Sequence, residues 1–292
     1  MNEAGQRWTG LAERQGHAPP AALAERRTAI EQARQSGFWR ADPAPAEDWL
    51  GGVRCLRFGA ADPPRSVLVH FHGGGFRQGC PEQIADYAAR LALRSGLELI
   101  CPNYRLAPEH PFPAGLHDGI AVLEALLKTG ARRIILAGDS AGGALAAGLA
   151  LLCGRRDIAI EGLILQSPWL DLSVTDPCYA TNGESDPLFS RNAAEEAAAL
   201  YLQGHDPRDS LASPIFAEID GFPPTFLSVG TGEVLAGDSR RFHVALAAAG
   251  VSTTLCCVAG MEHVAVTRDL TLPGAAHVFA ATLEFLAETV RT

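Results

Sequence analysis

A serine between two glycines is the residue in this chain best placed to do chemistry. The pentapeptide Gly138-Asp139-Ser140-Ala141-Gly142 follows an apolar run, residues 133–137, and opens a segment of small residues that continues to residue 150. Where a strand turns sharply into a helix, the serine hydroxyl stands exposed above the sheet, and side chains at 138 or 142 would clash. Glycine and serine also occur in ordinary turns, so the strand-to-helix setting carries the argument. The pattern predicts that Ser140 is a nucleophile.

A glycine-rich stretch upstream can supply hydrogen-bond donors to the same reaction. Residues 67–71 are typical of a buried strand, and His72-Gly73-Gly74-Gly75-Phe76, the glycine loop, follows directly. Attack on an ester carbonyl puts negative charge on its oxygen, and each preorganised N–H donor lowers the barrier by about 2.7 to 4 kcal/mol. A flexible glycine turn is the alternative. Because the serine lies downstream in the expected order, we expect Gly74, Gly75 and Ala141 to be the amide donors, and His72 to support the loop.

Four motifs occur in the order found in one enzyme family. The chain has H-G-G-G at 72–75, Y-R-L-A-P-E-H-P-F-P-A at 104–114, G-D-S-A-G at 138–142 and S-P-W-L-D-L at 167–172. With these motifs it resembles the hormone-sensitive-lipase-like esterases, a branch of the α/β-hydrolases. The resemblance implies an α/β-hydrolase fold, in which helices flank a mostly parallel central sheet and form a cap. It also implies hydrolysis of small carboxylic esters with short to medium acyl chains, through an acyl-enzyme and without a cofactor.

The acid that orients the catalytic base has two candidates. Many relatives have an aspartate in a D-P-L segment after the next-to-last strand, whereas this chain reads G-T-G-E-V-L-A-G-D-S at 230–239. Alignment of the strand at 225–229 and the following glycines puts Glu233 in the place of that aspartate, so we expect Glu233 to be the acid. Asp238 is the alternative. It lies where a helix through Gly250 is expected to begin, and a carboxylate there also serves as a cap or a partner of the helix dipole.

His263 is the expected general base. A strand pattern at 251–258 leads into Gly260-Met261-Glu262-His263, which resembles the family's G-M-x-H segment. This histidine also comes last in the chain order serine, acid, histidine that the fold requires. The chain has nine histidines, so position selects the base, and His277 falls inside the final helix pattern at 273–290.

The pattern of elements predicts one α/β domain that positions these residues. The chain has 292 residues, of which 47% are hydrophobic, enough for a large buried core. Strand patterns are interleaved with helical ones, which indicates a mostly parallel sheet covered on both faces. The predicted strands lie near 53–58, 67–71, 97–101, 133–137, 162–166, 225–229 and 253–257.

Two stretches depart from this alternation. Residues 1–45 contain a polar helical run from Ala21 to Gln35, and residues 171–215 insert an irregular and helical block. The resemblance implies that both fold over the serine as a cap, with the catalytic core formed by residues 46–170 and 216–292. The alternative is that the N-terminal part is only a surface helix, because termini are often loosely attached.

Charge and hydropathy exclude several partners. With 24 Lys plus Arg and 33 Asp plus Glu, the net charge is -9, so we expect no nucleic-acid partner, and the pair Arg26-Arg27 is interpreted as solvated surface. No apolar run approaches the roughly 18 residues of a membrane span, and the charged N-terminus does not resemble a signal peptide. We therefore expect a cytoplasmic protein.

Cysteine usage agrees with a reducing compartment, because the seven cysteines are an odd number. Four of them lie in apolar strand or helix context and are expected to be buried as small hydrophobic side chains. These are Cys101, Cys153, Cys256 and Cys257.

No metal or cofactor site is expected. His70 and His72 are two residues apart and could share one strand face. No acidic or thiol ligand lies beside them at the spacing of a metal site. The glycines around Ser140 are followed by no acidic partner for a dinucleotide ribose.

Two other functions stay open at this point. A lactone or other specialised ester hydrolase would use the same triad with a different cap pocket. A noncatalytic small-molecule binder on the hydrolase fold would lack the base, and His263 argues against it. A homodimer through the last strand is common among the resembled enzymes and is expected here by analogy alone.

Overall fold

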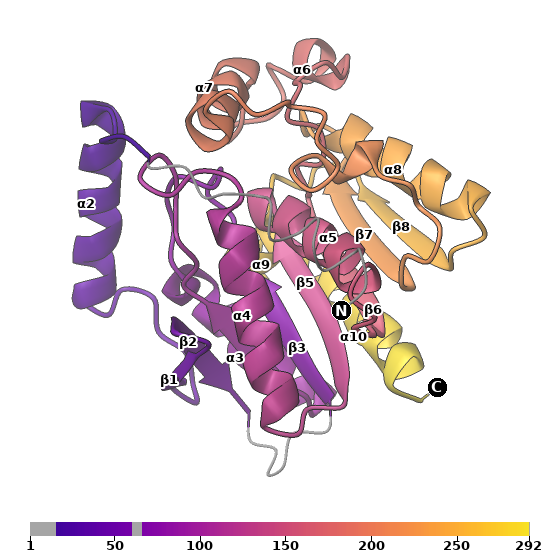
Figure 1. The fold of residues 1–292 in the computed structure, drawn as a ribbon. Coiled ribbons are helices and arrows are strands. Elements are labelled where there is room, and N and C mark those ends of the chain that lie inside the picture. The colour runs from indigo at the N-terminus through magenta and orange to yellow at the C-terminus, as the bar shows by residue number, and fades with distance from the viewer. Residues whose placement is uncertain (1–15, 60–65, 292) are drawn as a thin grey trace.

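One eight-stranded sheet organises the part of the chain that the computed structural model describes, residues 16–59 and 66–291 (Figure 1). The strand order is β1-β2-β4-β3-β5-β6-β7-β8. Neighbours from β4 to β8 run parallel, and only β1 and β2 run antiparallel to their neighbours. The strands are β1 (Ala46–Leu50), β2 (Val53–Phe58), β3 (Ser66–Phe71), β4 (Glu98–Pro102), β5 (Arg133–Asp139), β6 (Gly162–Gln166), β7 (Thr225–Gly230) and β8 (Thr253–Val258).

Helices cover both faces of this sheet. α4 and α5 share one core with Val67, Val69 and Phe71 of β3, whereas α3, α9 and α10 share the other with Leu68. Such alternation is expected of a strand buried on both sides. The helices are α2 (Ala21–Gln35), α3 (Ala85–Ser95), α4 (Ala114–Lys128), α5 (Ala141–Gly154), α6 (Cys178–Thr181), α7 (Arg191–Leu202), α8 (Ala236–Ala248), α9 (Ala265–Arg268) and α10 (Ala275–Arg291), with short 3-10 helices η1 (Pro81–Ile84) and η2 (Pro214–Phe216).

The predicted mostly parallel sheet is confirmed, with one strand more than expected. β1 pairs with β2 across the Gly51-Gly52 turn, where both glycines have positive φ. Its residues Ala-Glu-Asp-Trp-Leu are mostly exposed, because β1 is an edge strand. β1 lacks the apolar run by which the other strands could be recognised.

The prediction that four cysteines are buried is half wrong. Cys101 and Cys153 are buried, but Cys256 is only partly buried and Cys257 is exposed. Both lie on β8, which is the other edge of the sheet. A strand with a neighbour on one side only leaves more of its side chains accessible than an inner strand does.

Two groups of helices lie outside the layers that cover the sheet. Figure 1 shows α2 standing to one side, and α6 and α7 beyond the end of the sheet. An ion pair of 3.8 Å between Arg26 of α2 and Glu196 of α7 connects the two groups. α2 has the predicted bounds, whereas residues 1–15 of the expected N-terminal cap lie outside the described residues. None of the described helices has both the length and the apolar character that crossing a membrane requires.

The turn from β5 into α5 is sterically closed to side chains at both of its glycines. A Cβ atom at Gly138 would lie 2.1 Å from the backbone oxygen of Gly142. A Cβ at Gly142 would lie 2.1 Å from the backbone oxygen of Phe71 on β3. Ser140 at the apex has φ 53° and ψ -123°, outside the usual regions for a residue with a side chain. The expected close approach of backbone around this serine is therefore present.

We predict that Gly138→Ala destabilises the protein by about 1 to 3 kcal/mol or more, because the atoms that it would contact are backbone and cannot rotate away. Gly154→Ala is the matched control. It lies at the exposed end of α5, where an added Cβ would have no described atom within 4 Å apart from its chain neighbours and the backbone of its own helix. The control should gain up to about 1 kcal/mol. Urea unfolding of both variants measures the difference, and equal stabilities would contradict the steric argument.

Candidate active site

Ser140 and His263 meet at the carboxyl ends of the parallel strands. Ser140 lies between β5 and α5, and His263 lies on the loop between β8 and α9. Imidazole Nε2 is 3.0 Å from Ser140 Oγ, so the hydroxyl can donate to it. Both side chains are buried, with exposures of 6%. A serine and a base in this contact can transfer a proton when the serine attacks an electrophile.

Glu233 completes a hydrogen-bonded row. Its Oε2 atom is 2.7 Å from Nδ1 of His263, which identifies Nδ1 as the protonated nitrogen and leaves Nε2 to accept from Ser140. The other carboxylate oxygen accepts from the Gly230 amide at 2.5 Å and from the Ser167 hydroxyl at 2.9 Å. These donors compensate for burial of the carboxylate, which is 1% exposed.

Ser167 was not singled out from the sequence. It follows β6, has φ 46°, and accepts a hydrogen bond from the Val264 amide at 3.1 Å in addition to donating to Glu233. One hydroxyl thus connects the acid with the residue after His263. The S-P-W-L-D-L motif marked this position, but residue type alone did not show what the hydroxyl contacts.

The surroundings of His263 act on its pKa in opposite directions. Burial lowers the pKa, while the hydrogen bond to Glu233 and the negative charges of Glu233, Asp186 and Asp139 raise it. The net effect is a pKa above the ordinary value of 6.5. The site therefore favours the imidazolium that forms when the base accepts a proton.

The glycine loop lies against the serine turn. Gly74 and Gly75 line the same cavity as Ser140 and have φ values of 115° and 63°. Within the described residues, neither glycine amide donates to a protein acceptor. The amide of Ala141 is the first of α5 and has no acceptor within its own helix. Three amide donors are thus available close to the Ser140 hydroxyl.

Asp139 holds the glycine loop to the serine turn, a role that sequence analysis missed. Its Oδ2 accepts from the Gly73 amide at 3.0 Å, and its Oδ1 accepts from Nε2 of His70 at 2.9 Å. Asp139 directly precedes Ser140, so the glycine loop and Ser140 are fixed relative to one another. The G-D-S-A-G motif contained the residue but gave no sign of its partners.

His72 supports the glycine loop, as expected. Its Nδ1 donates to the Gly73 carbonyl at 2.7 Å, and its ring stacks on Tyr104 at 4.5 Å. The Tyr104 hydroxyl donates to the His72 carbonyl at 2.7 Å. Burial lowers the pKa of His72, which keeps the ring neutral.

The alternative acid, Asp238, lies away from the imidazole. It occupies the first turn of α8, as expected, but its Oδ2 accepts from the amides of Leu170 and Asp171 at 2.8 and 3.0 Å instead of capping its own helix. Burial raises the pKa of Asp238 to about 8. His277 is exposed on α10. The structure therefore places Glu233 and His263 in one hydrogen-bonded chain with Ser140. Neither Asp238 nor His277 is part of that chain.

Both segments expected to form a cap reach the cavity above Ser140, which has a volume of about 890 Å³. Ile30, Phe38 and Trp39 line it from the N-terminal side. Leu188 and Phe189 line it from residues 171–215. In the described residues, no group of three or more His, Cys, Asp or Glu is arranged to hold a metal ion.

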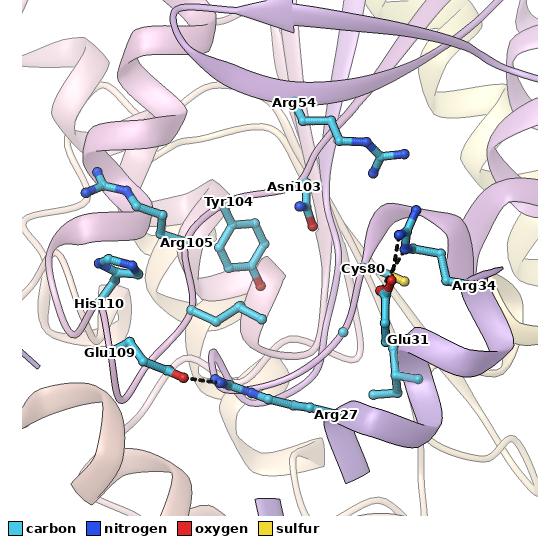
Figure 2. Close-up of a pocket in the computed structure, with 13 residues that line it drawn as sticks. Arg27, Glu31, Arg34, Arg54, Cys80, Asn103, Tyr104, Arg105, Glu109 and His110 are labelled. Carbon is cyan, nitrogen blue, oxygen red and sulfur yellow. Dashed lines mark hydrogen bonds and ion pairs between the residues drawn. The ribbon is translucent and has the colours of Figure 1, made fainter. Parts of the chain in front are cut away.

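A second cavity of about 580 Å³ lies between α2 and the loop at 103–110 (Figure 2). Arg27 was interpreted as solvated surface, and this was wrong. Its side chain is 23% exposed, pairs with Glu109 at 2.6 Å and donates to the carbonyls of Arg77 and Ala107. These contacts hold α2 against the residue that follows the glycine loop and against the loop at 103–110, so the helix is anchored.

Proteins of known class resemble this chain. Residues 68–267 match the family described as alpha/beta hydrolase fold. An esterase of Acinetobacter venetianus is 38% identical over 197 residues, which cover 66% of this chain and 65% of the relative. Carboxylesterase NlhH of Mycobacterium tuberculosis is 33% identical over 224 residues, which cover 72% of this chain and 69% of the relative. The chain thus spans about two thirds of the length of these curated relatives.

Solved structures match over nearly the whole chain. EstE5 soaked with p-nitrophenyl butyrate has a TM-score of 0.85 and 28% identity, with 100% of both chains covered. An esterase from the bacterial hormone-sensitive lipase family has a TM-score of 0.85 and 30% identity, covering 94% of this chain and 93% of that one. The chain belongs to the α/β-hydrolase family, in its branch of hormone-sensitive-lipase-like esterases.

Proposed function

We propose that this protein hydrolyses carboxylic esters with Ser140 as nucleophile, His263 as general base and Glu233 as the acid of the triad. The observation that carries the proposal is the hydrogen-bonded row from Ser140 Oγ through the imidazole to the Glu233 carboxylate. The row opens into the cavity that Gly74 and Gly75 line. Relatives named esterase and carboxylesterase support the same chemistry.

The proposed reaction has two halves. Ser140 Oγ attacks the ester carbonyl while His263 Nε2 takes its proton, and the oxyanion is stabilised by the amides of Gly74, Gly75 and Ala141. Collapse breaks the bond to the alcohol, which leaves with the proton from Nε2, and an acyl-enzyme remains. A water molecule then attacks the acyl carbon by the same proton path and releases the acid.

The proposed substrates carry short to medium acyl chains. The cavity is bounded on two sides by described residues of the segments that we propose as the cap, 1–45 and 171–215, and its volume of about 890 Å³ limits chain length. The p-nitrophenyl butyrate used with the similar EstE5 supports this size range. A lactone hydrolase would use the same proposed triad, so a panel of lactones belongs in the same assay.

Two further proposals concern the setting of the enzyme. All seven cysteines are free, which supports a cytoplasmic location. β8 is an edge strand, which supports a homodimer formed through it, and this dimer stays a prediction by analogy.

The function is tested by removing the nucleophile. We expect the wild-type protein to hydrolyse p-nitrophenyl butyrate and to react once with a fluorophosphonate, at Ser140. Ser140→Ala should lose both reactions and keep its unfolding temperature nearly unchanged, because the methyl group fits where the hydroxymethyl lies. Modification at another residue, found by mass spectrometry of the labelled peptide, would overturn the assignment.

Two isosteric variants distinguish the candidate acids. Glu233→Gln should lower kcat by about 10⁴-fold, since an amide that donates to Nδ1 would favour the wrong tautomer. Asp238→Asn should keep kcat close to that of the wild type, because among the described residues Asp238 accepts hydrogen bonds from the amides of Leu170 and Asp171 and makes none with the imidazole. The assay is p-nitrophenyl butyrate hydrolysis, and the reverse ranking would assign the acid to Asp238.

The pH profile tests the base. Only neutral His263 can accept the serine proton, so kcat/KM should be low in acid and rise as the imidazole loses its proton. Because the pKa of His263 is raised, the midpoint of this rise should lie above the ordinary histidine value of about 6.5. Initial rates across the range from acid to mildly alkaline buffer give the midpoint. A midpoint below the ordinary value would show that burial outweighs Glu233.

A further inference from the structure

Residues 182–189, the strap, lie across the turn that carries Glu233. Asn182 Nδ2 donates to the carbonyls of Thr231 and Glu233 at 3.1 and 2.7 Å. Ser185 Oγ donates to the carbonyl between them, that of Gly232, at 2.8 Å. Three successive carbonyls of the acid turn are therefore bound by side chains that lie 47 to 51 residues earlier in the sequence.

Asp186 connects this turn with the end of the strap. Its Oδ2 accepts from the Val234 amide at 3.0 Å, next to Glu233. Its Oδ1 accepts from the amides of Leu188 and Phe189, both at 3.0 Å. The side chain is 7% exposed, and three backbone donors offset the cost of burying its charge.

Phe189 carries the connection on to the base. Its ring lies over the His263 imidazole with a centroid distance of 5.7 Å and an interplanar angle of 12°. Trp169 also packs against Phe189, in an edge-on contact with a centroid distance of 5.5 Å. One carboxylate, that of Asp186, thus binds the backbone amide beside the acid and the backbone amide of the residue whose ring stacks on the base.

We propose that Asp186 and Phe189 are positioning residues, which act through Glu233 and His263 to hold the row in its reactive geometry. The inserted segment then does more than form a wall of the pocket, because it contributes to the arrangement of the triad. This inference rests on the proposed ester hydrolase function. Misplacement of catalytic groups by about 1 Å can cost about 10²-fold in rate, so a strap of this kind can act on kcat.

Charged groups around His263 set the expected pH response. The carboxylates of Glu233, Asp186 and Asp139 favour its protonated form. Arg268 donates to the His263 carbonyl at 3.4 Å and forms an ion pair with Glu262 at 2.9 Å. The opposite charges of Arg268 and Glu262 offset one another. Neutralising Asp186 removes a charge that favours imidazolium, and the rising limb of kcat/KM should therefore move to lower pH.

The experiment compares Asp186→Asn and Phe189→Leu with Glu184→Gln. Glu184 is an exposed carboxylate of the same segment, and within the described residues it makes none of these contacts, which makes it the matched control. With p-nitrophenyl butyrate, we expect Asp186→Asn to lower kcat by about 10- to 100-fold with KM nearly unchanged. We also expect the rising limb of kcat/KM to shift to lower pH in this variant. Phe189→Leu should slow the reaction of Ser140 with fluorophosphonate, and the control should match the wild type.

The outcomes separate the inference from the function on which it rests. If the wild type fails to hydrolyse the ester, the proposed function is wrong. If the wild type is active and both Asp186→Asn and Phe189→Leu match Glu184→Gln in kcat, labelling rate and pH profile, the positioning role is wrong while the function stands. Should Asp186→Asn not fold, Phe189→Leu and Asn182→Ala decide alone, by the same labelling rates and pH profiles.

Discussion

The hydrogen bond between the Glu233 carboxylate and the His263 imidazole is the interaction on which the rest of the site depends. Both groups are buried, and a buried charge is costly unless polar partners replace water. Ser167 and Gly230 supply those partners on the carboxylate oxygen that does not face the imidazole. Because these donors compensate the acid, the other oxygen can hold Nδ1, so that Nε2 faces Ser140.

Parallel topology explains why residues so far apart in sequence meet. Ser140 follows β5, Ser167 follows β6, Glu233 follows β7 and His263 follows β8, and these four strands are consecutive neighbours in the sheet. The glycine loop follows β3, which is the neighbour of β5 on the other side. In a parallel sheet all these strands end at the same edge, so each loop delivers one group to a single place. The segments at 16–45 and 171–215 then bound the space above that edge.

Sequence reasoning found the residues whose surroundings restrict residue type. Gly138 and Gly142 have no room for a Cβ, so the serine turn has a visible pattern. Alignment with the resembled family placed Glu233, and the chain order of the triad together with the G-M-x-H resemblance placed His263. Asp139, at the end of β5, and Asp186, between α6 and α7, were missed because the residue type of an aspartate does not show whether its carboxylate binds backbone amides or water. The exposure of Cys257 was missed for a related reason. A strand's position at the edge of a sheet depends on topology, which its own residues do not encode.

The contacts of Arg27 make the attachment of α2 insensitive to the pH range in which His263 titrates. A guanidinium does not lose its proton in the working range of an enzyme, and two of its acceptors are backbone carbonyls, which do not titrate. Its third acceptor is Glu109, where burial raises the pKa, but the hydrogen bond and positive charge of Arg27, a backbone hydrogen bond and the charge of His110 together leave the pKa below the usual value of 4.5. The attachment of this helix therefore persists through the range in which the imidazole titrates. If the proposed function holds, loss of activity near neutral pH is expected to report a change of protonation at His263 and not a detachment of the cavity wall that α2 forms.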